Sequence, residues 1–152
     1  MASLFMETTG ISAEQTAGEV TYLLSQAGAA KIMQEFDKQR AVSGLSFSLR
    51  VGDCELAFTL PVRTEPIFKI INGRRPVVRR QRCEDQDREQ SVRVAWRQIF
   101  RWVQAQLAMI ETGMVRTEEV FMPYMVLKGK KTMYEVMSAQ GFQKALPAPT
   151  ND

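Results

Sequence analysis

The chain has 152 residues, of which 45% are hydrophobic and 24% charged, and its formal net charge is +3 at pH 7. This length can bury one hydrophobic core, and no apolar run approaches the roughly 20 residues that a bilayer span needs, so we expect one domain over residues 1–152 that does not enter a membrane. The sequence contains no histidine, which removes the commonest general base and metal ligand together. We therefore expect a non-enzymatic protein that uses no cofactor and no metal.

The opening residues and the cysteines indicate the compartment. The stretch MASLFMETTG lacks the basic and apolar regions of a signal peptide. Cys54 and Cys83 form no C-x-x-C motif, and we interpret both as reduced thiols. The sequence therefore predicts a cytoplasmic protein.

The first half of the chain predicts a helix followed by three strands. Ser12 and Gln15 match the capping box that begins a helix, and Gly28 suits its C-terminal end. Apolar and polar residues alternate, as they do in half-buried strands, in KIMQEFD (31–37), LSFSLRV (45–51) and CELAFTLPV (54–62). This pattern predicts an antiparallel meander after the first helix.

The second half predicts one long helix and several short segments. Residues 67–72 fit a brief helix or an extended arm, and Gly73 and Pro76 make the arginine-rich stretch that follows a loop. Apolar residues spaced by three and four predict the long helix over residues 87–112. A shorter helix capped by Thr117 and limited by Pro123 follows, and a last helix is predicted over 133–140.

The predicted fold class is α+β. An N-terminal helix and a three-stranded antiparallel meander precede a long helix, and that helix and shorter C-terminal helices pack on the sheet. We expect loosely held tails at residues 1–10 and 146–152, because termini without secondary structure are seldom tied down.

Positive charge is concentrated between residues 63 and 82. This segment holds seven basic residues and one acid, a net charge of +6, whereas the rest of the chain nets −3. Such polarisation is typical of surfaces that bind phosphate backbones, and the planar guanidinium group suits bidentate contacts with phosphate. We expect Val77 and Val78 to dock the loop on the body of the protein and turn the guanidinium groups outward. The candidate phosphate-binding residues are Arg74, Arg75, Arg79, Arg80 and Arg82.

A second group of arginines lies on the long helix. Arg93, Arg97 and Arg101 recur every four residues and form one stripe, in which neighbouring like charges repel by a few tenths of a kcal/mol unless an anion lies beside them. Trp102 lies at the edge of the apolar face, where it would stack on a base, fill an oligomer contact or pack partly buried. These four residues join the candidate nucleic-acid interface.

The acidic stretch CEDQDREQ (83–90) leaves a second interpretation of the arginines open. Its carboxylates are close enough in sequence to fold back onto the loop or the stripe. The arginines would then form an internal salt-bridged surface. The acidic residues in question are Glu84, Asp85, Asp87 and Glu89.

Asp53 and Glu55 form a D-x-E pair, which in a carboxylate-metal nuclease would begin a metal site. No lysine follows at the short spacing that nuclease patterns show, and a hairpin turn ending in two polar residues also accounts for the pair. We expect the hairpin.

The block RVAWRQIFRWVQAQLAMIETGMVRTEEVFMPYMV (93–126), with DREQ before it and TMYE after it, resembles a group of small uncharacterised proteins carried by bacteriophages and prophages. LSFSLRVGDCELAFTLPV (45–62) fits the same group. The resemblance implies a mobile-element setting, which favours DNA handling or interference with host machinery. The order helix, three strands, helix is also similar in layout to double-stranded-RNA-binding domains and to single-strand annealing proteins.

Together these patterns predict a nucleic-acid-binding protein of a phage or mobile element, which contacts DNA phosphates through the arginine-rich loop and the helix stripe. Single-strand binding or annealing is among the roles this surface would serve. The alternative is a phage-encoded inhibitor or adaptor of the anti-defence type that binds an acidic host protein. The apolar stretch VFMPYMV (120–126), if exposed, would mark the contact of a homo-oligomer.

Overall fold

The structure, a computed structural model, describes residues 2–143 and 146–148. Its elements follow in the order α1 (Ala13–Gln26), β1 (Lys31–Phe36), β2 (Val42–Val51), β3 (Cys54–Thr59), α2 (Glu65–Gly73), α3 (Val77–Arg80), α4 (Glu84–Glu111), α5 (Thr117–Phe121), the 3-10 helix η1 (Met122–Tyr124) and α6 (Met133–Ala139). This order confirms the predicted α+β class, with its meander and long helix. Within these residues, no helix combines the length and the apolar character that crossing a membrane requires.

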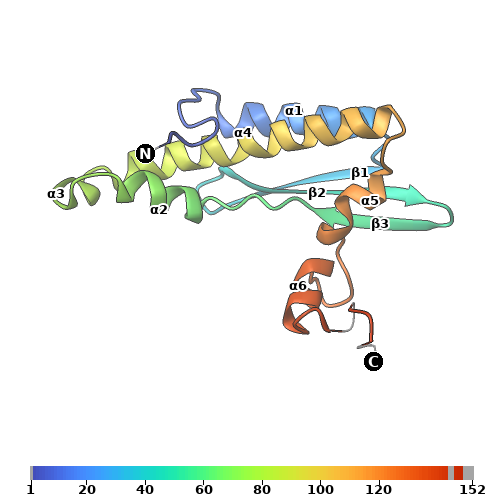
Figure 1. The fold of residues 1–152 in the computed structure, drawn as a ribbon. Helices are drawn as coiled ribbons and strands as arrows, with labels where there is room; N and C mark the ends of the chain where they lie inside the picture. Colours follow the sequence, from blue (N-terminus) through green and yellow to red (C-terminus); the bar gives the residue numbers. More distant parts are fainter. Residues whose placement is uncertain (1, 144–145, 149–152) are drawn as a thin grey trace.

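The sheet is an antiparallel meander of order β1-β2-β3, and α1 and α4 lie side by side over one of its faces (Figure 1). The register places Phe47 of β2 opposite Ile32 of β1 and Phe58 of β3. Because successive side chains of a strand point to opposite faces, these residues turn toward the helices, whereas Ser46 and Ser48 turn away from them. The alternation seen in the sequence therefore sets which face is covered.

The core lies between the sheet and the two long helices. Trp96 of α4, Leu24 of α1 and Phe58 of β3 are completely buried. Each such side chain stabilises the fold by about 1.5–3 kcal/mol relative to an exposed one. Phe121 of α5 closes the core and meets the Phe47 ring edge-on at a centroid distance of 5.2 Å. The stretch 120–126 is thus partly core, although Met122 within it stays about half exposed.

Helix ends follow the sequence closely at α1 and less closely at α4. The Ser12 hydroxyl accepts a hydrogen bond from the Gln15 amide at 3.1 Å, and Gly28 takes a φ of +93°, as the caps predict. The long helix begins at Glu84, three residues before the predicted start. Acidic residues in its first turn stabilise the positive end of the helix dipole, which explains the extension. The short helices predicted from residues 117 and 133 correspond to α5 and α6.

The stretch after β3 is more helical than predicted. Residues 67–72 belong to α2, which decides between the helix and the extended arm. The arginine-rich stretch is not all loop: Pro76 leads into the single turn of α3, and the Arg79 amide donates to the Pro76 carbonyl at 2.8 Å. Val77 and Val78 are 74% and 88% exposed, so the expectation that they dock this segment on the body is wrong.

The N-terminal segment is also held more firmly than predicted. Leu4 packs against the small apolar cluster around Ile67. The Gln90 side-chain amide of α4 donates to the carbonyls of Glu7 and Thr9 at 2.8 and 2.9 Å. These bonds supply partners for backbone groups that no strand or helix satisfies, so residues 4–9 lie fixed along α4. Of the two predicted tails, residue 1 and residues 149–152 lie outside the described part of the chain.

Candidate nucleic-acid interface

The arginine-rich segment, residues 74–82, forms a projection at one end of the molecule, which we term the arginine tip (Figure 1). Arg75 anchors it through a bidentate contact, with Nε and Nη2 each 2.7 Å from an oxygen of Asp87. Asp87 is buried, with 2% of its side chain exposed, and it also accepts a hydrogen bond from Asn72 at 3.0 Å. The hydrogen bonds from Arg75 lower the pKa of the Asp87 carboxyl despite its burial. Arg75 is therefore committed to the fold.

Two further arginines of the tip also make internal contacts. Arg80 donates from Nε to the Arg75 carbonyl at 3.2 Å and from Nη2 to the Gly73 carbonyl at 3.1 Å, so it binds carbonyls at the end of α2. Arg74 pairs with Glu7 and donates to the Ala2 carbonyl at 2.9 Å. The Arg74 charge is neutralised by this pairing, whereas among the described residues Arg80 has carbonyl partners and no carboxylate, so its charge is kept.

Arg79 and Arg82 differ from the other arginines of the tip. Both are exposed, and within the described residues neither has an ion pair or a side-chain hydrogen bond. They follow the exposed Val77 and Val78 in the same stretch of the chain. The tip thus presents free guanidinium groups on a frame that other arginines hold in place.

The arginines of the helix stripe also differ in whether they have an internal carboxylate partner. Arg93 pairs with Glu89 on the same helix at 2.6 Å, which is the ordinary i,i+4 spacing. Arg97 is buried, with 8% of its side chain exposed, and its Nη1 lies 2.5 Å from Glu19 of α1. The hydrogen bond from Arg97 lowers the pKa of the Glu19 carboxyl.

Arg101 is the member of the stripe that remains exposed and unpaired with a carboxylate in the described part of the chain. It donates only to the Gln104 amide oxygen, at 3.1 Å. The predicted contact of Arg97 with a phosphate conflicts with its burial, because α1 covers it and supplies its anion. A single position of the stripe is therefore free for a ligand.

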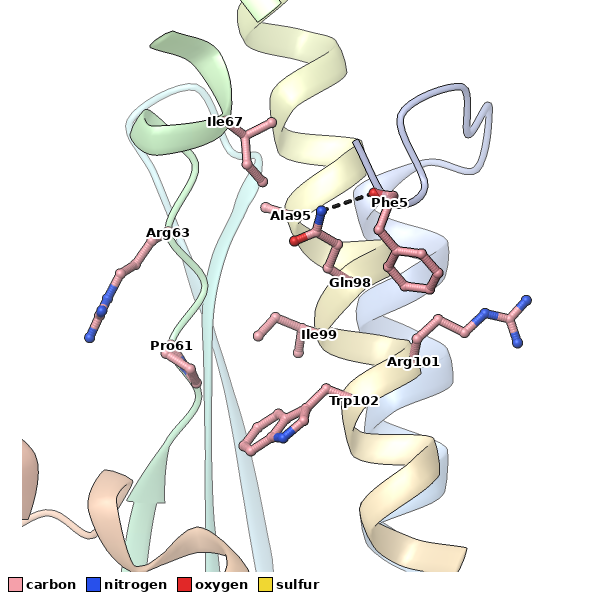
Figure 2. A pocket seen from close by; sticks show the side chains of 9 residues that line it. All are labelled: Phe5, Pro61, Arg63, Ile67, Ala95, Gln98, Ile99, Arg101 and Trp102. Atoms are coloured by element: carbon pink, nitrogen blue, oxygen red, sulfur yellow. Dashed lines mark hydrogen bonds between the residues drawn. The ribbon is translucent and has the colours of Figure 1, made fainter. Parts of the chain in front are cut away.

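Trp102 lies half-buried on α4, as the sequence indicated. Its ring meets Phe121 and Tyr124 edge-on at 5.5 Å each. The same ring lines a pocket of about 500 Å³ between α4, the segment that leads into α2, and the N-terminal segment (Figure 2). Two residues that sequence reasoning did not select, Phe5 and Gln98, also line this pocket. No pattern in the sequence marks Phe5, because its place depends on how the N-terminal segment runs along α4.

The D-x-E pair lies far from this surface, at the β2–β3 hairpin. Glu55 forms an ion pair with Lys31 at 3.1 Å and accepts a hydrogen bond from Ser48 at 2.8 Å. Asp53 lies in the turn itself, as the hairpin interpretation predicted. Over residues 2–143 and 146–148, no group of three or more cysteine, aspartate or glutamate side chains is placed to hold a metal ion.

Of the residues predicted from the sequence, Arg79, Arg80, Arg82 and Arg101 thus retain a charge that no described carboxylate neutralises, and Trp102 is partly open to solvent. Arg74, Arg75, Arg93 and Arg97 have internal anions. Arg63 and Lys69, counted in the basic segment, are exposed as well. Comparison of the chain with protein-family models, with curated proteins and with solved structures gave no match.

Proposed function

We propose that the protein binds DNA without catalysis, through phosphate contacts from the arginine tip and from Arg101. The observation that supports this most is the charge left over after internal pairing. In the basic segment, Arg74 and Arg75 have carboxylate partners, and the single acid of the segment, Glu65, is taken by Arg88. Five cations of that segment have no carboxylate partner among residues 2–143 and 146–148 and are left for an external anion: Arg63, Lys69, Arg79, Arg80 and Arg82.

The arrangement of these cations suits an extended polyanion. The tip precedes the first turn of α4, and Arg101 lies 17 residues beyond Glu84 on that helix. At about 1.5 Å of rise per residue, the two places are separated by roughly 25 Å along the helix. Lys69 lies on α2, which packs against α4, and Arg63 lies in the segment that leads into α2 (Figure 1). A nucleic-acid backbone spans such a length with several phosphates, whereas a single small anion does not.

A salt titration tests this function. Anisotropy of a labelled mixed-sequence DNA should report an affinity that falls steeply between about 50 and 200 mM salt, because bound cations release counterions from the phosphates. Substituting Arg79→Gln together with Arg82→Gln should lower the slope of log affinity against log salt by about 2. The matched control is Arg50→Gln with Arg116→Gln, which removes the same charge from the end of β2 and the start of α5, two elements that lie at the other end of the molecule from α3 (Figure 1). Absence of binding at the lowest salt, or equal slopes for the two double variants, would refute the function.

The exposed valine pair supports a second candidate, binding of an acidic host protein by a phage-encoded inhibitor. Two adjacent aliphatic side chains that are 74% and 88% exposed are not needed for phosphate contact. If a protein is the partner, Val77→Ser with Val78→Ser should abolish its capture while the salt slope on DNA stays unchanged. Both candidates place the protein in the cytoplasm, in the mobile-element setting that the resemblance implies.

A further inference from the structure

The pocket beside Trp102 has apolar walls and a floor of aliphatic side chains. Trp102, Phe5 and Ile99 contribute apolar surface, and Ile67 and Ala95 add the aliphatic side chains between α2 and α4. Figure 2 shows the Phe5 ring on one side of the pocket and the Trp102 indole directed toward the segment around Pro61. The Phe5 ring is 62% exposed although its backbone is held in place. An exposed aromatic ring beside a half-buried one offers stacking surface to a flat ligand.

One polar group in the pocket is held in a fixed orientation. The Gln98 amide nitrogen donates to the Phe5 carbonyl at 2.9 Å, and only the nitrogen of that amide can donate to a carbonyl. The amide oxygen is therefore turned the other way, toward the segment that holds Ile67 (Figure 2). This oxygen can accept a hydrogen bond from an amino or ring N–H group. The apolar walls of the pocket suit the flat faces of a nucleobase, and the fixed Gln98 acceptor suits an N–H donor on its edge.

The two cations at the rim of the pocket suit the phosphates that lie on either side of a nucleobase in a strand. Arg63 and Arg101 both line the pocket, and in Figure 2 their guanidinium groups extend in opposite directions from it. Neither is paired with a carboxylate in the described residues. A base that belongs to a polymer has a phosphate on each side, so a base in this pocket would place one backbone arm toward each arginine.

We infer that this pocket binds an unstacked base of single-stranded DNA, an inference that rests on the proposed function and specifies its substrate. A duplex does not serve, because its bases are stacked and their pairing edges are occupied. The tip and the pocket then have different roles in binding. The tip holds the backbone by charge alone, and the pocket distinguishes a single strand from any other polyanion of equal charge.

The test compares three ligands of equal length: a mixed-sequence single strand, the corresponding duplex, and an abasic strand that keeps every phosphate and has no bases. The wild-type protein should bind the single strand about tenfold more tightly than the abasic strand, within the range that stacking one or two bases provides. Binding of the single strand should also quench the fluorescence of Trp102, because Trp96 is completely buried and does not meet the ligand.

Phe5→Ala tests the pocket without disturbing the core, because the ring is 62% exposed. This variant should bind the single strand and the abasic strand with equal affinity. Tyr22→Ala on α1 is the matched control, since that ring is 64% exposed but belongs to another surface, and it should keep the tenfold preference. Trp102→Leu should behave as Phe5→Ala does, with circular dichroism confirming that it folds.

The outcomes separate the pocket from the proposed function. If no ligand binds at low salt, the DNA-binding function fails and the pocket fails with it. If the single strand, the duplex and the abasic strand bind wild type equally, or Phe5→Ala keeps the full preference, the pocket inference is overturned while DNA binding stands. A preference for the single strand that Phe5→Ala abolishes and Tyr22→Ala retains supports it.

Discussion

Replacing Glu19 by glutamine should destabilise the protein strongly, because it leaves the Arg97 charge buried without its anion. The Arg97 guanidinium is 8% exposed, and its other contacts are the Thr16 hydroxyl at 3.4 Å and the Phe100 ring at 4.2 Å, neither of which carries a charge. Removing one partner of a buried ion pair costs about 3–5 kcal/mol. Glu19 is one third exposed, so water screens part of the effect and we expect the lower end, about 3 kcal/mol.

Urea denaturation followed by circular dichroism measures this cost. Glu89→Gln is the control, since Glu89 also pairs with an arginine of α4 but is 67% exposed, and its loss should cost about 0.5 kcal/mol or less. Adding Arg97→Met to Glu19→Gln should restore stability, because the methionine removes the buried charge and keeps the apolar stem. Equal costs for Glu19→Gln and Glu89→Gln, or no recovery in the double variant, would show that Arg97 is not committed to the core and would return it to the ligand-binding residues.

The remaining predictions concern the arginine tip and the loss of folding stability at low pH. Asp87→Ala should lower stability by about 3 kcal/mol and, measured by anisotropy, should weaken DNA binding even though it raises the net charge. Val77→Ser with Val78→Ser should leave the free energy of unfolding, measured with urea, unchanged to within about 0.5 kcal/mol, because both side chains are already exposed. The lowered pKa values of Asp87 and Glu19 stabilise the folded state above their ordinary pKa near 4. Stability measured by urea should therefore hold from neutral pH to about 5 and fall as the pH drops below about 4; a midpoint independent of pH down to 3 would contradict this.

Local patterns were sufficient to predict α1, the three strands and α4, but they did not predict α3. Ser12 and Gly28 act through their immediate neighbours, and the alternation around Phe47 needs only the two-residue period of a strand. The predicted start of α4 is three residues late, although Glu84, Asp85 and Asp87 all lie in its first turn. These acids stabilise a helix N-terminus, and that local effect extends the helix.

The pairing of the arginines was predictable only in part. Glu89 with Arg93 follows from the helical spacing of four residues. The partner of Arg97, in contrast, lies 78 residues away on α1, and that of Arg74 lies 67 residues away in the N-terminal segment. No window of the sequence contains such pairs, because they depend on how α1 and the N-terminal segment pack against the rest of the fold.

Some arginines of the tip hold the others in place. Asp87→Ala therefore distinguishes binding that depends on net charge from binding that depends on preorganised arginines. If affinity depended on net charge alone, removing an acid beside the tip would strengthen binding to DNA. In the structure, however, Asp87 fixes Arg75, and the Arg75 carbonyl in turn accepts a hydrogen bond from Arg80. A frame held in this way presents Arg79 and Arg82 in one arrangement, so little conformational entropy is lost when a phosphate binds. Weaker binding by a more positive variant is the result that preorganisation predicts and that net charge cannot produce.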